Sequence, residues 1–331
     1  MHNCSGRPYS AQGCSDELPC LDARMPRLLK RSYYASGRLL RYAGAGVVAR
    51  AITPATTIRV CLSHFVRAED VAHYGRLVSM MRTRRRMIAP SELFDYYTQP
   101  APSLCGEFLL MSFDDGLLSS FTATQQVLNP LGIKAIFFVP TAILELRGPD
   151  DMRQFYWERV YRKRRPLAGL RPEEYVAMTA DHLRELSRQG HSIMPHTHSH
   201  MHLSQITSPA LVEQELTRPR RLLEDLVDQA APGFAFPVGS ERVISAQAYR
   251  SIRKIYSFCF TGLNGMNSER TDPFYLHRDP IHAHDTCEHT ATVMGGAYDL
   301  YYWTKMRRLK QRAATSSDQL DDDAQSHCPH E

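Results

Sequence analysis

The strongest constraint on the fold is an alternation of short apolar segments with amphipathic ones from Thr57 onward. The apolar segments have the length and composition of buried strands, and the segments between them have helical spacing. Repeated β–α units of this kind predict a parallel sheet or barrel. The predicted strands are residues 58–65, 107–113, 134–140, 191–195, 233–237, 256–261 and 275–281. The predicted helices are residues 68–84, 118–132, 179–190, 208–229 and 245–254.

The number of predicted strands indicates how the sheet is arranged. A complete β/α barrel has eight strands, and about seven are predicted here. We therefore expect the α/β class, as a distorted, incomplete parallel β/α barrel with an N-terminal helical extension and disordered ends. A doubly wound sheet is the alternative.

The chain divides into four predicted parts around this barrel. A disordered leader covers residues 1–25, and a basic amphipathic helix and linker cover 26–56. The barrel covers 57–302, and a basic helix with an acidic tail covers 303–331. Because residues 1–24 lack periodicity, Met25 is also a candidate start of translation. The amphipathic helix is expected either to pack on its own domain or to lie on an acidic membrane surface.

Composition narrows the classes of function and the location. A net charge of +5, from 40 basic and 35 acidic residues, does not indicate nucleic-acid binding. No stretch approaches the ~18 consecutive apolar residues of a membrane helix, and the first residues lack a signal-peptide pattern. We expect a cytoplasmic protein with reduced cysteines, or one at the inner face of the membrane in contact with it through its basic helices.

An insertion interrupts the β–α pattern at residues 145–175 and carries the run "RQFYWERVYRKRRPL". A basic run of this kind is typical of a solvated face. Its aromatic residues leave a second interpretation open, in which the insertion is a rim that grips a polymeric or anionic substrate.

Two adjacent carboxylates, Asp114 and Asp115, follow the predicted strand 107–113 and precede Gly116. Neighbouring side chains of a strand point to opposite faces, so both carboxylates reach one site only if the chain bends there. One carboxylate would then hold a metal while the other takes a proton. Asp-Asp-Gly is also ordinary turn chemistry, so this motif alone leaves both interpretations open.

A histidine run, "HTHSHMHL", follows the predicted strand 191–195 and places histidines at positions 196, 198, 200 and 202. Residues four apart share a face of a helical turn, so either His196 with His200 or His198 with His202 suits one metal ion. Active sites of parallel barrels lie at the carboxyl ends of the strands, where the aspartates also lie. We expect one divalent metal ion there, zinc first, with cobalt, nickel or manganese as alternatives.

The motifs "SFDDG", "GHSIMPHTHSH" and "FAFPVG", in this order, resemble those of the polysaccharide deacetylases, the NodB-homology group of carbohydrate esterases. The resemblance covers roughly residues 57–300. It implies that Asp115, His196 and His200 bind the metal. It also implies that Asp114 is the general base in the hydrolysis of N-acetyl groups on an amino-sugar-containing glycan or glycan precursor.

The resemblance also implies further catalytic groups, at positions that match the family's motifs less closely. A backbone N–H near Pro237, Val238 and Gly239 is expected to bind the substrate oxyanion. The family's third motif often reads Arg-x-Pro-Tyr, whereas this chain has Ala235 and Val238 at the arginine and tyrosine positions. We expect Arg278, from the predicted strand 275–281, to supply the missing arginine from across the barrel.

The proton donor to the leaving amine is expected among the late histidines. His282 shares the strand parity of Arg278, which would place both on the barrel's inner face, and His284 is the alternative. The altered third motif also supports a rival function, a catalytically silent barrel that binds glycan and retains the metal. A third hypothesis is a metal-binding histidine tract unrelated to catalysis.

Overall fold

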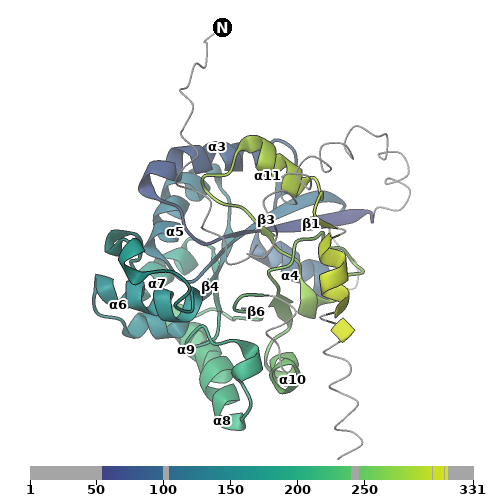
Figure 1. Cartoon of the computed structure of the whole chain (residues 1–331). Helices are drawn as coiled ribbons and strands as arrows, with labels where there is room; N and C mark the ends of the chain where they lie inside the picture. The colour runs from purple at the N-terminus through teal and green to yellow at the C-terminus, as the bar shows by residue number, and fades with distance from the viewer. Residues whose placement is uncertain (1–53, 100–103, 240–245, 300, 309, 312–331) are drawn as a thin grey trace, which may run out of the picture.

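A computed structural model describes residues 54–99, 104–239, 246–299, 301–308 and 310–311. The predicted leader, the amphipathic helix and the acidic tail after residue 311 lie outside these ranges. Within them, helices surround a parallel sheet (Figure 1).

The main sheet is formed by five strands in the order β5-β4-β3-β1-β8, with β2 paired to the start of β3. All of these pairings are parallel. Their bounds are β1 Thr56–Ser63, β2 Arg86–Met87, β3 Gly106–Asp114, β4 Ala135–Val139, β5 Ser192–Pro195 and β8 Asp279–Pro280. A second parallel pair consists of β6 Gly233–Ala235 and β7 Phe258–Phe260.

Hydrogen bonds between the two sheets nearly close a ring. Leu276, just before β8, donates to the Cys259 carbonyl and accepts from Thr261, each at 2.8 Å. At the other side, β6 lies beside β5, and the His196 ring bonds to the Ala235 carbonyl at 2.8 Å. No strand ladder joins β5 to β6 in the described ranges. The predicted α/β fold, a distorted and incomplete parallel barrel, is confirmed.

The helices alternate with the strands as expected, and Ser208 caps its helix by accepting from the Leu211 N–H. β2 and α4 were not among the predicted elements, and three of the helical segments contain π turns. The helices are α3 Val71–Arg82, α4 Pro90–Thr98, α5 Leu118–Ala123, α6 Pro149–Phe155, α7 Ala180–Arg188, α8 Pro209–Val212, α9 Arg218–Val227, α10 Ala246–Ile255 and α11 Cys287–Met294. The π turns are η2 Thr124–Leu128, η5 Tyr156–Val160 and η9 Glu213–Thr217.

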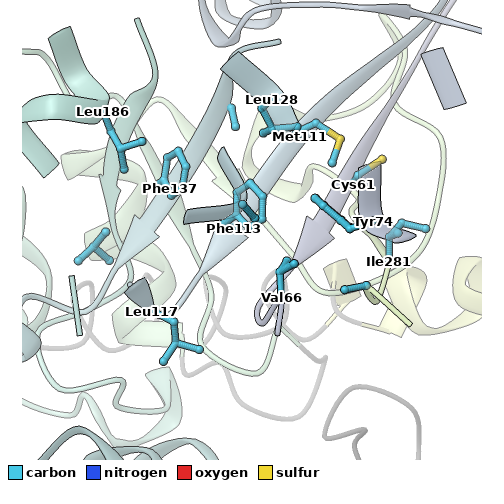
Figure 2. Close-up of a cluster of buried hydrophobic side chains, with 14 of the residues drawn as sticks. Cys61, Val66, Tyr74, Met111, Phe113, Leu117, Leu128, Phe137, Leu186 and Ile281 are labelled. Carbon is cyan, nitrogen blue, oxygen red and sulfur yellow. The ribbon is translucent and has the colours of Figure 1, made fainter. Parts of the chain in front are cut away.

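Alternation along the strands builds two apolar clusters on opposite faces of the sheet. One fills the barrel interior and includes Val60 of β1, Leu110 of β3 and Phe138 of β4. The other, between sheet and helices, includes Met111 and Phe137 (Figure 2). Because both faces of these strands are buried, they read as continuous apolar runs in the sequence.

His191, at the start of β5, is a buried histidine far along the strand from the carboxyl end. Its Nδ1 accepts from the Ala135 N–H at 3.0 Å, and its Nε2 lies 3.0 Å from Asn129 Oδ1. These bonds fit the neutral ring with the proton on Nε2. Burial, assisted by Lys134, lowers the pKa of His191 to about 4.

This lowered pKa predicts a loss of stability in acid. Between pH 6.5 and pH 4 the unfolded state binds the proton that the folded state excludes, so the free energy of unfolding falls as pH decreases. In His191→Gln, the decrease in the free energy of unfolding between pH 7 and pH 5 should be smaller by about 2 kcal/mol. Urea titrations at the two pH values measure it, with the exposed His284→Gln as control. An unchanged pH dependence in His191→Gln would contradict the assignment.

Candidate functional site

The adjacent carboxylates of Asp114 and Asp115 reach one site because the chain bends between them. Asp114 ends β3, and Asp115 has a φ of 70°. Gly116 follows with a φ of 67°, and a Cβ there would lie 2.2 Å from the Ile143 side chain. The glycine therefore permits the tight turn that breaks the strand's alternation and brings both carboxylates together.

Asp114 is held by a buried ion pair with Arg278. The guanidinium donates to both carboxylate oxygens, at 2.6 and 2.9 Å, and its Nε donates to the Thr261 carbonyl at 2.8 Å. Both side chains are almost fully buried, at 3% and 1% exposed. Burial would raise the pKa of Asp114, but the charge of Arg278, with smaller effects of His196 and His64, lowers it overall. Asp114 is thus a carboxylate at neutral pH.

Asp115, His196 and His200 form a compact group of metal-ligand type. Their ligand atoms all lie within 4.8 Å of one another, and all three residues are buried. Asp115 Oδ1 lies 3.4 Å from His200 Nε2 and 3.7 Å from His196 Nε2, and it has no hydrogen-bond partner among the described residues. An orphaned carboxylate oxygen facing two imidazole nitrogens is a donor set that fits a zinc-like cation.

The protonation of the two histidines suits this role. His196 Nδ1 must donate to the Ala235 carbonyl, which leaves the lone pair of Nε2 directed at the carboxylates. Burial lowers the pKa of His196 to about 4 and also lowers that of His200, despite the opposing effect of the aspartates. Both rings are therefore neutral, as metal ligands must be.

The other two histidines of the run have different partners. His198 Nδ1 lies 2.9 Å from Thr141 Oγ1, and His202 Nδ1 lies 2.7 Å from Arg162 Nη1. Of the two pairs that the spacing left open, the structure brings His196 and His200 to the carboxylates.

The loop that carries the histidines is held by a residue the sequence analysis missed. Glu215, fully buried on η9, accepts from the N–H groups of His198 and Ser199, at 3.1 and 2.9 Å. Thr197 and His200 have positive φ values of 62° and 55°. This tight loop places the rings of His196 and His200 with their centroids 4.9 Å apart. In the sequence, the signal for this role of Glu215 was an acidic residue on the inner face of the predicted helix 208–229.

Two further residues at the site were also missed. Tyr156, from the insertion, is buried and donates its hydroxyl to Asp115 Oδ2 at 2.6 Å. Burial, followed by the charge of Asp115, raises the pKa of Tyr156 well above its usual value, so it remains a neutral donor. His64 follows β1, and since Ser63 is paired with Phe113 of β3, His64 lies at the same carboxyl end of the sheet as Asp114. Its place at a strand's carboxyl end was the signal that could have identified it.

The predicted late residues lie at the same end of the barrel. His282 follows β8, and its buried Nε2 has no hydrogen-bond partner in the described part of the chain. Its ring stacks on the exposed His284 with centroids 5.6 Å apart. Burial lowers the pKa of His282 to about 4.

The segment Pro237, Val238 and Gly239 forms a turn after β6, with positive φ at Val238 and Gly239. Pro237 has no N–H, so only the other two residues offer backbone donors.

The geometry agrees with the comparisons to known proteins. Residues 103–254 match the family model described as polysaccharide deacetylase. The resemblance to the polysaccharide deacetylases is confirmed. The family match includes the aspartates and the histidine run and ends before Arg278 and His282. A search of curated proteins found no significant match.

Several solved structures have a similar fold, among them the following three. The Streptococcus pyogenes deacetylase PplD, in complex with acetate, is 18% identical, with 73% of this chain and 99% of that chain covered and a TM-score of 0.56. IcaB from Ammonifex degensii is 19% identical, with coverages of 72% and 96% and a TM-score of 0.55. The de-N-acetylase from Aggregatibacter actinomycetemcomitans is 14% identical, with coverages of 70% and 97% and a TM-score of 0.53. At these identities the likeness shows a shared fold.

The buried pair of Asp114 and Arg278 predicts a large stability effect. Arg278→Ala leaves an unpaired buried carboxylate and should cost about 3–5 kcal/mol in the free energy of unfolding at pH 7. Arg184→Ala, which breaks an exposed pair with Asp181, should cost less than about 1 kcal/mol. Urea denaturation measures both. Adding Asp114→Asn should recover part of the Arg278→Ala loss, and equal losses for Arg278→Ala and Arg184→Ala would contradict the prediction.

Proposed function

We propose that this protein is a metal-dependent hydrolase that removes N-acetyl groups from an amino-sugar-containing glycan or glycan precursor. The observation that carries the proposal is the buried group of Asp115, His196 and His200 beside the ion-paired Asp114. Three protein ligands leave coordination positions for water and substrate, which is the pattern of a catalytic metal site. The family match over residues 103–254 supports the same reaction class.

The metal would be held by Asp115 Oδ1, His196 Nε2 and His200 Nε2, and zinc suits this donor set best. When bound, such an ion polarises a carbonyl and lowers the pKa of water. Cobalt, nickel or manganese are alternative occupants of the same ligands.

Asp114 is the proposed general base. Arg278 fixes its orientation and keeps it ionised, and each carboxylate oxygen retains a further lone pair that can accept a proton. In the family's third motif, an arginine would orient the base. Arg278, which contacts Asp114, can take that role here. This contact favours an active enzyme over the silent glycan-binding barrel, which is the alternative function.

The remaining steps need an oxyanion donor and an acid. The backbone N–H groups of Val238 and Gly239, beyond Pro237, are the proposed donors to the developing oxyanion. His282 is the proposed acid. Because burial lowers its pKa to about 4, its ring is neutral in the free protein, so it would first take up the proton that Asp114 removes from water. It would then pass this proton to the amine as the C–N bond breaks, which releases acetate and the free amino sugar.

Contact with a membrane surface stays a prediction. No helix in the described ranges has both the length and the apolar character needed to cross a membrane. In the basic C-terminal segment, Trp303 is 57% exposed, and Arg307, Arg308 and Lys310 are exposed near it in the sequence. These side chains support contact with an anionic lipid surface.

The proposal predicts how metal content and acetate release depend on the site. Asp115→Ala, His196→Ala and His200→Ala should each lose metal and acetate release, whereas Asp114→Asn should keep metal and lose activity. Elemental analysis measures occupancy, and a panel of N-acetylated sugars measures acetate release. His198→Ala is the matched control from the same run and should retain metal. Metal retained in His196→Ala but lost in His198→Ala would contradict the ligand set, and a metal-loaded parent that releases no acetate would favour the silent barrel.

A separate prediction concerns the general acid. His282→Ala should lower turnover roughly a hundredfold or more while leaving metal content intact, because a positioned acid usually contributes 10²–10⁴-fold. His284→Ala, from the exposed ring stacked on His282, should remain within a few-fold of the parent. Turnover measurements on both variants and on His64→Ala locate the donor. A fully active His282→Ala with an inactive His64→Ala or His284→Ala would move the role to the other histidine.

A further inference from the structure

The insertion has a buried aromatic side that faces the metal group. It begins with α6, Pro149–Phe155, and continues into the π turn η5, Tyr156–Val160. Tyr156 and Val160 are buried, whereas Arg162 and Lys163 are exposed. The basic residues noticed in the sequence therefore form a solvated edge here, while the aromatic residues pack inward. Single π turns within helices are frequent at functional sites, since they shift the following side chains.

Tyr156 makes a short hydrogen bond to one particular oxygen of Asp115. Its hydroxyl donates to Oδ2 at 2.6 Å, and the two side chains are 4% and 1% exposed. An ionised carboxylate only accepts hydrogen bonds, so Tyr156 is the donor. The length is that of a charge-assisted O–H···O⁻ bond, which is stronger than a neutral one.

The two carboxylate oxygens of Asp115 have different surroundings. Oδ2 is occupied by Tyr156, whereas Oδ1 faces the imidazole nitrogens of His196 and His200 and lacks a partner within the described ranges. The insertion thus contacts the group through Asp115.

We propose that Tyr156 is a positioning residue of the metal centre, which fixes Asp115 so that Oδ1 alone coordinates the ion. The inference rests on the metal site of the proposed function and extends it to a residue outside the recognised motifs. Groups that hydrogen-bond to metal ligands typically contribute 10–100-fold in metal affinity. The insertion is then part of the metal centre's support as well as a part of the surface.

A purely structural role for Tyr156 is the competing explanation, because its ring also packs in an aromatic cluster. Its centroid lies 5.2 Å from that of Tyr161 and 5.0 Å from that of Tyr175. The Tyr175 hydroxyl meets the Tyr161 hydroxyl at 3.1 Å. Tyr175→Phe therefore removes a hydroxyl from the same cluster without touching the bond to Asp115, and it is the matched control.

The test compares the full-length parent with Tyr156→Phe and Tyr175→Phe. Zinc affinity is measured by chelator competition at pH 7, and the melting temperature of each metal-free protein is measured beside it. Tyr156→Phe should bind zinc about 10–100-fold more weakly than the parent, and Tyr175→Phe within about threefold of it. Tyr156→Phe should lower the metal-free melting temperature more than Tyr175→Phe, because it leaves the buried Asp115 carboxylate without its hydrogen bond. Cobalt(II) as a second probe should show a changed visible spectrum only in Tyr156→Phe, because Oδ2 becomes available to the ion.

Two results would overturn the inference. Parent-like zinc affinity and cobalt spectrum in Tyr156→Phe would show that Asp115 needs no such support. Weakened affinity in both variants, in proportion to lowered metal-free melting temperatures, would assign Tyr156 a packing role. A parent that binds no zinc or cobalt would instead refute the metal site itself, so the two failures are distinguishable.

Discussion

The site depends on how two adjacent buried carboxylates are kept from destabilising the barrel. Taking a carboxylate out of water is costly unless a charge or hydrogen bonds replace the solvent. Arg278 meets this need for Asp114 through two hydrogen bonds and ties it to the carbonyl of Thr261 after β7. Among the described residues, Asp115 has Tyr156 as the hydrogen-bond partner of one oxygen and no partner for the other, which is an acceptor that a cation would satisfy. The contrast between the two residues supports the proposal that Asp114 accepts a proton and Asp115 binds a metal ion.

The same arrangement accounts for the altered third motif. Ala235 occupies the position where the family often has arginine. Its backbone carbonyl accepts from His196 Nδ1 and so selects the tautomer in which Nε2 has a free lone pair. A backbone carbonyl does this whatever the side chain, so the substitution leaves the support of His196 intact. The charge that the motif lacks comes from Arg278, which reaches the site from the segment before β8. Support that is usually local in sequence is supplied here from across the barrel.

Much of the fold and part of the site could be predicted because they depend on short-range pattern. The strands read as apolar runs, and strand parity placed Arg278 on the inner face, where it meets Asp114. Spacing alone could not choose between the histidine pairs, because the decision depends on two positive φ values and on Glu215. Tyr156 is 41 residues from Asp115, and its orientation is set by a π turn that no simple period reveals. Side chains that meet through loops and irregular turns leave no periodic signal in the sequence.

The most direct test of the account is the position of a metal ion in crystals grown with zinc, located by its anomalous scattering. We expect one ion bound by Asp115 Oδ1, His196 Nε2 and His200 Nε2, with Asp115 Oδ2 still bonded to the Tyr156 hydroxyl and Asp114 still paired with Arg278. An ion held by His198 and His202, or no ion near Asp115 at saturating zinc, would contradict it.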